Sequence, residues 1–487
     1  MKNDRNYSKL NQHHLDKKRG VVKTPLNNRL GDKLNLSSWT ESRMPEYLWL
    51  GLILANLGRH EGLNKTTEIL FDISKSNIAL TGPKLSSILQ LSIEEQEIVY
   101  NIILNHVDAK LIAPLTILYR NDEHQTFNKY FYVPELTFEY RLQVLSNSIN
   151  LFSPHQSNEA TDLRFLAICL HIFNKRIQIS MDSRITTQAL QEYSRTHHDD
   201  EKMRSYRPVI RSMEGITATD IDKKFSKKFW RDIGMMTPCK PMQFKFDLNS
   251  DDYESFVSNS KRLLEYIFLT NKEKSLLDEK FDVLIGSASY SLKILNEIAT
   301  KSLGDCILGR HGTRTILEIY IILKYLIKKE SEIPNIWADY KLYGISKYKL
   351  LLLKARESDS TNTSHFILPI VEALVNEIKW EEFIDIDLKY FDKLGIREKS
   401  VEVGEKELYD LLYDYDSNFS HGLWGAIRES SMLICDNSDH RYHTVPDFNL
   451  NQNLSDVKSD ILMLTKKVLF LIVENYETPE ALTKFLQ

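Results

Sequence analysis

The chain has 487 residues, of which 42% are hydrophobic, so its apolar content is sufficient for the cores of two or three domains. Its 63 Lys and Arg residues against 67 Asp and Glu residues give a net charge of −4, which excludes a strong global attraction for nucleic acid. Its 4 cysteines lie far apart without a C-x-x-C pair, which excludes a disulfide framework and favours free thiols in a reducing cytoplasm.

The N-terminal part predicts a helical domain behind a polar arm. Residues 1–36 are rich in Lys and Arg and poor in large apolar residues, which predicts a basic, flexible arm. Order is expected from Ser38, because Ser38-Trp39-Thr40-Glu41 has the form of a capping box. The next segment, Pro45–Leu57, is apolar on every side, so we expect a helix buried among others. Further amphipathic segments extend this domain over residues 37–218: Lys65–Ile73, Lys84–Leu91, Ile93–Leu104, Leu111–Tyr119 and Ala160–Ser180. Short strand candidates are Lys129–Val133 in this domain and Gln243–Phe246 after it.

The end of this domain is basic and leads to a connector. Arg204 and Arg207 flank Tyr206, a mixture that suits stacking on bases and neutralisation of phosphates, and equally an acidic protein partner or a solvated face. Proline density around Thr237–Pro241 places a connector at residues 219–252. The densest group of metal-type side chains, Arg195–Glu201, lacks a second spaced group, so we expect neither a metal nor a cofactor.

Residues 253–487 predict a second helical domain, an antiparallel bundle, and the whole chain is therefore expected to be all-α. No apolar run approaches the length of a membrane span, so no membrane partner is expected. The predicted helices are Tyr253–Leu269, Glu273–Thr300, Thr313–Lys329, Trp337–Glu357, Ile367–Asp385, Glu405–Cys435 and Leu454–Tyr476.

Two polar strings interrupt the apolar faces of this second domain. In the first, Arg314 and Glu318 are four residues apart on one helical stripe, where they can pair. Gly309 and Gly312 precede them, and each would cost about 1 kcal/mol inside a helix, so they indicate a helix start or a close backbone approach.

The second string places Tyr413, Ser417, His421 and Arg428 on one stripe of a helix. A histidine in such company can accept, donate or hold a proton near neutral pH. The alternative is a core histidine that is hydrogen-bonded to Glu318 or to a tyrosine.

The two strings, with Ile396-Arg397-Glu398-Lys399 and Tyr409 between them, resemble the bacterial domain of unknown function 5677 (DUF5677) over about Ser260–Tyr476. That family has no settled activity. Its arginine, glutamate and histidine on antiparallel helices are similar to the HEPN class of small helical ribonucleases, many of which are toxins or anti-phage effectors. This sequence departs from the usual HEPN spacing, because its arginine and histidine would meet from separate helices.

The resemblance implies a cytoplasmic toxin-like or anti-phage effector that cleaves RNA without a metal. In that reading His421 transfers a proton, Arg314 stabilises the phosphorane, and Glu318, Ser417 or Tyr413 orient them. The candidate RNA contacts are Arg310, His311, Arg428, Arg204 and Arg207. The alternative is a non-catalytic interaction or sensor protein that recognises a phage or protein trigger, with the same polar group fixing helix register. A homo-oligomer is compatible with either reading.

Overall fold

The computed structural model describes residues 9–30, 37–120, 122–177, 183–218, 221–246, 252–357, 365–386 and 390–486. Within these residues the chain is predominantly helical with two small sheets, which confirms the all-α expectation. None of the helices in these ranges is long and apolar enough to cross a membrane. Parts of the predicted arm (1–8 and 31–36), the end of the predicted helix at 178–180 and parts of the predicted connector (219–220 and 247–251) lie outside the described residues.

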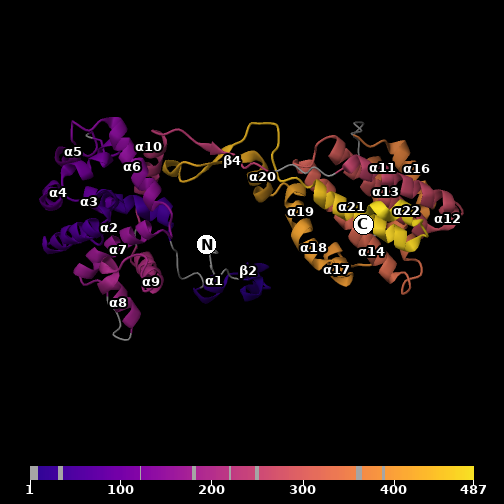
Figure 1. Cartoon of the computed structure of the whole chain (residues 1–487), viewed down its shortest axis with the longest axis horizontal. Helices are drawn as coiled ribbons and strands as arrows, with labels where there is room; N and C mark the ends of the chain where they lie inside the picture. Colours follow the sequence, from indigo (N-terminus) through magenta and orange to yellow (C-terminus); the bar gives the residue numbers. More distant parts are fainter. Residues whose placement is uncertain are drawn as a thin grey trace. The chain divides into compact units, whose positions relative to one another are not determined.

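The chain forms two compact units (Figure 1). Each unit has its own hydrophobic core. Unit 1 comprises Met1–Pro241 together with the segment Ile434–His443, which we call the return loop. Unit 2 comprises Met242–Leu433 and Thr444–Gln487. The points at which the chain passes from one unit to the other lie in or beside three short strands. These strands are β3 Pro241–Met242, β4 Met432–Cys435 and β5 Thr444–Pro446.

Unit 1 begins with a small antiparallel hairpin, β1 His14–Asp16 and β2 Val21–Lys23, in which Leu15 lies opposite Val22. Its helical segments follow in chain order: η1 Leu10–Gln12, α1 Pro25–Leu30, η3 Trp39–Arg43, α2 Met44–Lys75, α3 Leu85–Leu89, α4 Ile93–His106, η4 Ala109–Leu111, η5 Ala113–Ile117, α5 Gln125–Phe131, α6 Phe138–Phe152, α7 Asn158–Phe173, α8 Arg184–Glu192, η6 Tyr193–Arg195, α9 Met203–Thr217, α10 Lys223–Gly234 and, in the return loop, η9 Ser438–His440. The strand candidate at Lys129–Val133 was wrong, because its first part belongs to helix α5.

Helix α2 is the centre of unit 1. The Ser38 hydroxyl accepts a hydrogen bond from the Glu41 amide just before it, as the capping pattern predicts. Every residue of α2 from Met44 through Leu54 is buried, and α7 packs along the helix. The helix axis breaks at Gly58, whose φ of 75° suits glycine because it carries no Cβ. The expected apolar helix therefore exists and ends where its apolar run ends.

The expected connector at 219–252 differs from the structure. Helix α10 lies inside that range, yet it buries Phe229, Trp230 and Ile233 in the core of unit 1. The side chains of those three residues lie on one face of the helix, so burial against the core stabilises it there. The boundary between the units falls inside the predicted range, at Pro241.

Unit 2 is built around helix α14, which contacts α13, α17, α19 and α21. Its helical segments are α11 Tyr253–Thr270, α12 Lys274–Leu277, α13 Glu279–Thr300, α14 Ile307–Lys329, α15 Ile336–Glu357, α16 Leu368–Asn376, η7 Glu381–Phe383, α17 Ile396–Glu402, α18 Lys406–Leu408, η8 Tyr409–Tyr413, α19 Asp414–Ser420, α20 Trp424–Ser431, α21 Lys458–Asn475, α22 Glu480–Thr483 and η10 Lys484–Leu486.

The prediction of one continuous helix over Glu405–Cys435 was wrong. The chain turns at Gly422, which has a φ of 57°, and continues as α20 and then as strand β4. The Leu423 amide donates a hydrogen bond to the Asn418 carbonyl across this turn. Such a glycine ends a helix because an L side chain is strained in that conformation. His421 therefore lies at the end of α19 rather than inside a long helix.

Candidate functional site

The predicted site residues of the C-terminal half lie along the contact between α14 and the continuous segment η8–α19, which we call the seam. Arg314 of α14 contacts Tyr413, at the start of α19. Arg310, one turn nearer the start of α14, lies over the ring of Phe419 near the end of α19. The two helices therefore run antiparallel, with the start of α19 beside the middle of α14.

Arg314 joins the two sides of the seam. Its Nη2 donates a hydrogen bond of 2.8 Å to the Tyr413 hydroxyl and lies 3.3 Å from a carboxylate oxygen of Glu318. Its guanidinium carbon is 4.8 Å from the centroid of the Tyr413 ring. The side chains of Arg314 and Glu318 are 25% and 29% exposed, so solvent reaches both. Burial raises the pKa of Tyr413, which keeps its hydroxyl protonated at neutral pH. The predicted pair of Arg314 and Glu318 is therefore present, and the Tyr413 hydroxyl is a third member of the group.

Arg310 has a different role from the one we predicted. Its side chain is fully buried. Its Nη1 donates to the carbonyl oxygens of Gly304 at 3.0 Å and Cys306 at 3.2 Å, and its Nη2 donates to the Ser455 carbonyl. Gly304 and Cys306 precede α14 and Ser455 precedes α21, so these bonds link the start of α14 to the segment before α21. Because no part of Arg310 reaches solvent, this arginine does not present itself to RNA.

Asp416 is the acidic side chain buried in the seam. It is 2% exposed, and burial raises its pKa to about 7, against the opposing influence of Arg310. Burial disfavours a carboxylate because water no longer solvates the charge. Asp416 therefore titrates near neutral pH, which is the range required of a group that accepts and releases protons.

Several polar atoms of the seam are buried without a hydrogen-bond partner among the described residues: Arg310 Nε, His311 Nε2, Arg314 Nε, Asp416 Oδ2 and Ser417 Oγ. Each such atom costs about 1–3 kcal/mol in a packed interior. The segment that carries Tyr413 also begins with a π-helical turn, η8, and such turns are frequent at functional sites. Buried polar atoms without a partner require an explanation, and a functional role is one such explanation.

His421 does not join Arg314. It follows the last residue of α19, so the antiparallel register places it beside the start of α14, beyond Arg310. Eight residues separate it from Tyr413, which corresponds to about 12 Å along a helix. Its side chain is exposed and makes no hydrogen bond or ion pair within the described ranges. The expected meeting of guanidinium and imidazole was wrong, because the turn at Gly422 leaves the histidine at a helix end.

The other predicted RNA contacts are dispersed. Arg428 is half-buried and donates to the Met432 carbonyl at 3.0 Å. Arg204 and Arg207 lie on α9 in unit 1, where Arg204 is exposed. Arg207 donates to the Asn158 side chain at 3.0 Å and to the His198 carbonyl at 3.1 Å, so it supports local structure. Arg428 and Arg207 therefore both hydrogen-bond to nearby backbone, and Arg204 alone of these three is exposed.

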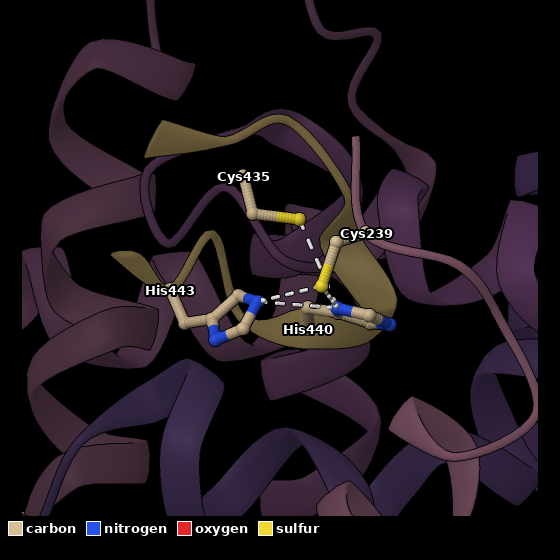
Figure 2. Close-up of side chains that lie close together, drawn as sticks. All are labelled: Cys239, Cys435, His440 and His443. Atoms are coloured by element: carbon tan, nitrogen blue, oxygen red, sulfur yellow. Dashed lines mark hydrogen bonds between the residues drawn. The ribbon is translucent and has the colours of Figure 1, made fainter. Parts of the chain in front are cut away.

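The sequence analysis did not predict a second group of side chains. Unit 1 brings together Cys239, Cys435, His440 and His443, whose ligand-type atoms all lie within 4.8 Å of one another (Figure 2). We expected free thiols and no metal, because the cysteines are far apart in the chain. The available signal was the His440-x-x-His443 spacing shortly after Cys435. The fourth member comes from a segment about two hundred residues earlier, which only folding reveals.

Comparisons with known proteins identify one family. Its model, a family of unknown function (DUF5677), matches residues 310–441, which is narrower than the range expected from the motifs. No curated protein and no solved structure matches the chain. The matched residues include both sides of the seam, from Arg310 through Tyr413 and Asp416 to His421. The similarity to the DUF5677 family therefore lies in the C-terminal half of this chain, and it spans the seam residues from Arg310 to Asp416.

Proposed function

We propose that the seam is the active centre of a metal-independent endoribonuclease, and that the protein is a bacterial toxin-like or anti-phage effector. The observation that carries the proposal is the solvent-reachable group of Arg314, Tyr413 and Glu318 on two contacting helices. It combines a permanent cation, a hydroxyl donor and a carboxylate. Those are the chemical types that phosphodiester cleavage needs when no metal supplies the charge.

The proposed reaction is attack by the ribose 2′-hydroxyl on the adjacent phosphorus. Glu318 takes the proton from the 2′-hydroxyl as the new O–P bond forms, and the bond from phosphorus to the 5′-oxygen breaks. The departing 5′-oxygen takes a proton from the Tyr413 hydroxyl. The products are a 2′,3′-cyclic phosphate and a 5′-hydroxyl end. Arg314 stabilises the extra negative charge of the phosphorane, because its guanidinium cannot be deprotonated in proteins.

This assignment moves proton transfer away from His421, for which the motif alone had suggested that role. His421 remains exposed at the end of α19, where it is able to contact a strand of RNA that approaches the seam. Its loss should therefore weaken RNA binding more than it slows cleavage.

A second candidate function is a non-catalytic interaction or sensor protein. The fully buried Arg310 favours this second function, because its side chain is hydrogen-bonded to backbone carbonyls and fixes the start of α14. Under this reading the seam determines helix register, and variants of it change stability without any loss of a reaction.

The experiment incubates the purified full chain with labelled single-stranded RNA in buffer without added divalent ions. Glu318→Gln and Tyr413→Phe each remove one proposed proton-transfer group, and we expect cleavage to fall about 10²–10⁴-fold. Arg356→Ala is the matched control, because Arg356 forms ion pairs with Glu372 and Glu381 away from the seam in the same unit. Cleavage that the control retains and the two seam variants lose supports the proposal.

Cells expressing the same variants provide an independent readout. Growth arrest with degraded RNA in wild type, and neither in Glu318→Gln, is the expected pattern. Intact RNA in every strain, together with no cleavage by the purified wild type, would reject the ribonuclease and leave the interaction protein.

A further inference from the structure

We propose that Cys239, Cys435, His440 and His443 form a structural zinc site that fastens the return loop within unit 1. Cys239 lies after helix α10 and Cys435 is the last residue of strand β4, whereas His440 ends the short helix η9 and His443 follows it (Figure 2). The proposal is independent of the reaction proposed for the seam, since all four residues belong to unit 1.

The distances within the group match those around a tetrahedral ion. Cys239 Sγ lies 3.3 Å from His440 Nδ1 and 3.4 Å from His443 Nε2. Cys435 Sγ lies 3.7 Å from His440 Nδ1, and the two imidazole nitrogens are 3.2 Å apart. Zinc bonds of about 2.3 Å to sulfur and about 2.0 Å to nitrogen place S···N pairs about 3.5 Å apart and N···N pairs about 3.3 Å apart. These four edges are therefore close to those of a zinc tetrahedron, and the two sulfur edges that remain are no longer than 4.8 Å.

The surroundings orient the ligands for a metal. The Nε2 atom of His440 lies 3.0 Å from the Thr237 carbonyl oxygen, to which it donates when it carries the proton. In that tautomer the lone pair is on Nδ1, the atom that faces the two sulfurs. The Lys240 amide donates to Cys435 Sγ at 3.3 Å, and such a bond stabilises a thiolate. Both contacts are of the kind that supports metal ligands from outside.

The donor set selects the ion and its role. Two thiolates and two imidazoles in a tetrahedron are typical of zinc, and their charges balance a divalent cation. Four protein ligands complete the tetrahedron, so no position remains for a substrate or a reactive water. The geometry points to a structural site rather than to a catalytic one.

The consequence for the fold is a cross-link between distant parts of the chain. Cys239 follows helix α10, whereas the other three ligands lie in the return loop, about two hundred residues later. The loop also makes its own contacts with unit 1, since Ser146 donates to Asp439 at 2.6 Å and Arg441 pairs with Glu41 at 2.9 Å. These bonds allow a ligand variant to remain folded while it loses the ion.

The test measures the zinc content of the full chain purified under reducing conditions without chelator. We expect about one zinc per chain in wild type and less than about a tenth of that in Cys239→Ser and in His443→Ala. Both substituted residues are exposed, which limits damage to folding. Cys306→Ser is the matched control, because Cys306 lies in unit 2, and it should retain the wild-type zinc content.

Cobalt provides a second readout that does not depend on zinc carried through purification. Apoprotein titrated with Co²⁺ should develop the absorption of a tetrahedral cobalt–thiolate centre at one ion per chain, and Cys239→Ser should not. The proposal is overturned if wild type holds no zinc and shows no such absorption. A Cys239–Cys435 disulfide found by thiol titration in place of the metal overturns it as well.

Discussion

Replacement of Asp416 by asparagine is the most direct test of the physical state of the seam. Asp416 is 2% exposed, and its pKa is raised by burial from the ordinary value of 3.8 to about 7. Below both values the folded and unfolded chains bind this proton equally. Between them the folded chain holds the proton and the unfolded chain does not, so the free energy of unfolding falls as pH rises. Above about pH 7 the loss is complete and constant.

The gap between 3.8 and about 7 corresponds to about 4 kcal/mol of stability at neutral pH and above. Asparagine has nearly the same shape and cannot ionise. We therefore expect Asp416→Asn to be more stable than wild type above pH 7 by up to about 4 kcal/mol, and the difference to shrink steadily toward acidic pH. The amide of the variant adds a buried donor, which lowers its curve by about 1–2 kcal/mol at every pH without changing the slope.

The assay is urea unfolding of the full chain, followed by circular dichroism from about pH 5 to about pH 8. Asp414→Asn is the matched control, because it removes an exposed carboxylate from the same helix. If Asp416→Asn were less stable than wild type by the same amount at every pH, Asp416 would be ionised and paired with Arg310. The reasoning from burial would then be refuted.

Three further predictions concern packing, a buried ion pair and the metal. Gly309→Ala should destabilise unit 2 by about 1–3 kcal/mol, because a Cβ there would lie 2.5 Å from the Leu303 carbonyl oxygen. Gly344→Ala is the control and should not destabilise the unit, because the space around Gly344 is open; urea unfolding measures both variants. Lys399→Met should lower the free energy of unfolding by about 3–5 kcal/mol, because Lys399 is fully buried and its loss leaves the Asp392 carboxylate without its ion-pair partner. The double variant with Asp392→Asn should recover part of that stability, whereas additive losses would contradict the pairing. A strong zinc chelator should lower the unfolding temperature of wild type and leave that of Cys239→Ser unchanged, whereas equal shifts would show that the chelator acts elsewhere.

Local chemistry made part of this molecule predictable. The apolar run from Pro45 to Leu57 specified a buried helix, because no face of it could remain in water. Gly309 and Gly312 indicated a close backbone approach, and the structure confirms it: a Cβ at Gly312 would lie 2.4 Å from Ile298 Cδ1. The four-residue spacing of Arg314 and Glu318 correctly predicted their pairing, since residues at that spacing share a helix face.

Other features depended on the tertiary structure, because residue spacing along one helix does not specify which element packs against that helix. The antiparallel register of α14 and α19 joined Arg314 to Tyr413 and left His421 at a helix end, because register depends on how two surfaces pack. Burial of Arg310 likewise follows from its neighbours rather than from its own motif. The group around Cys239 was hidden for the same reason: its members are about two hundred residues apart in sequence, and only the folded chain brings their sulfur and nitrogen atoms within 4.8 Å of one another.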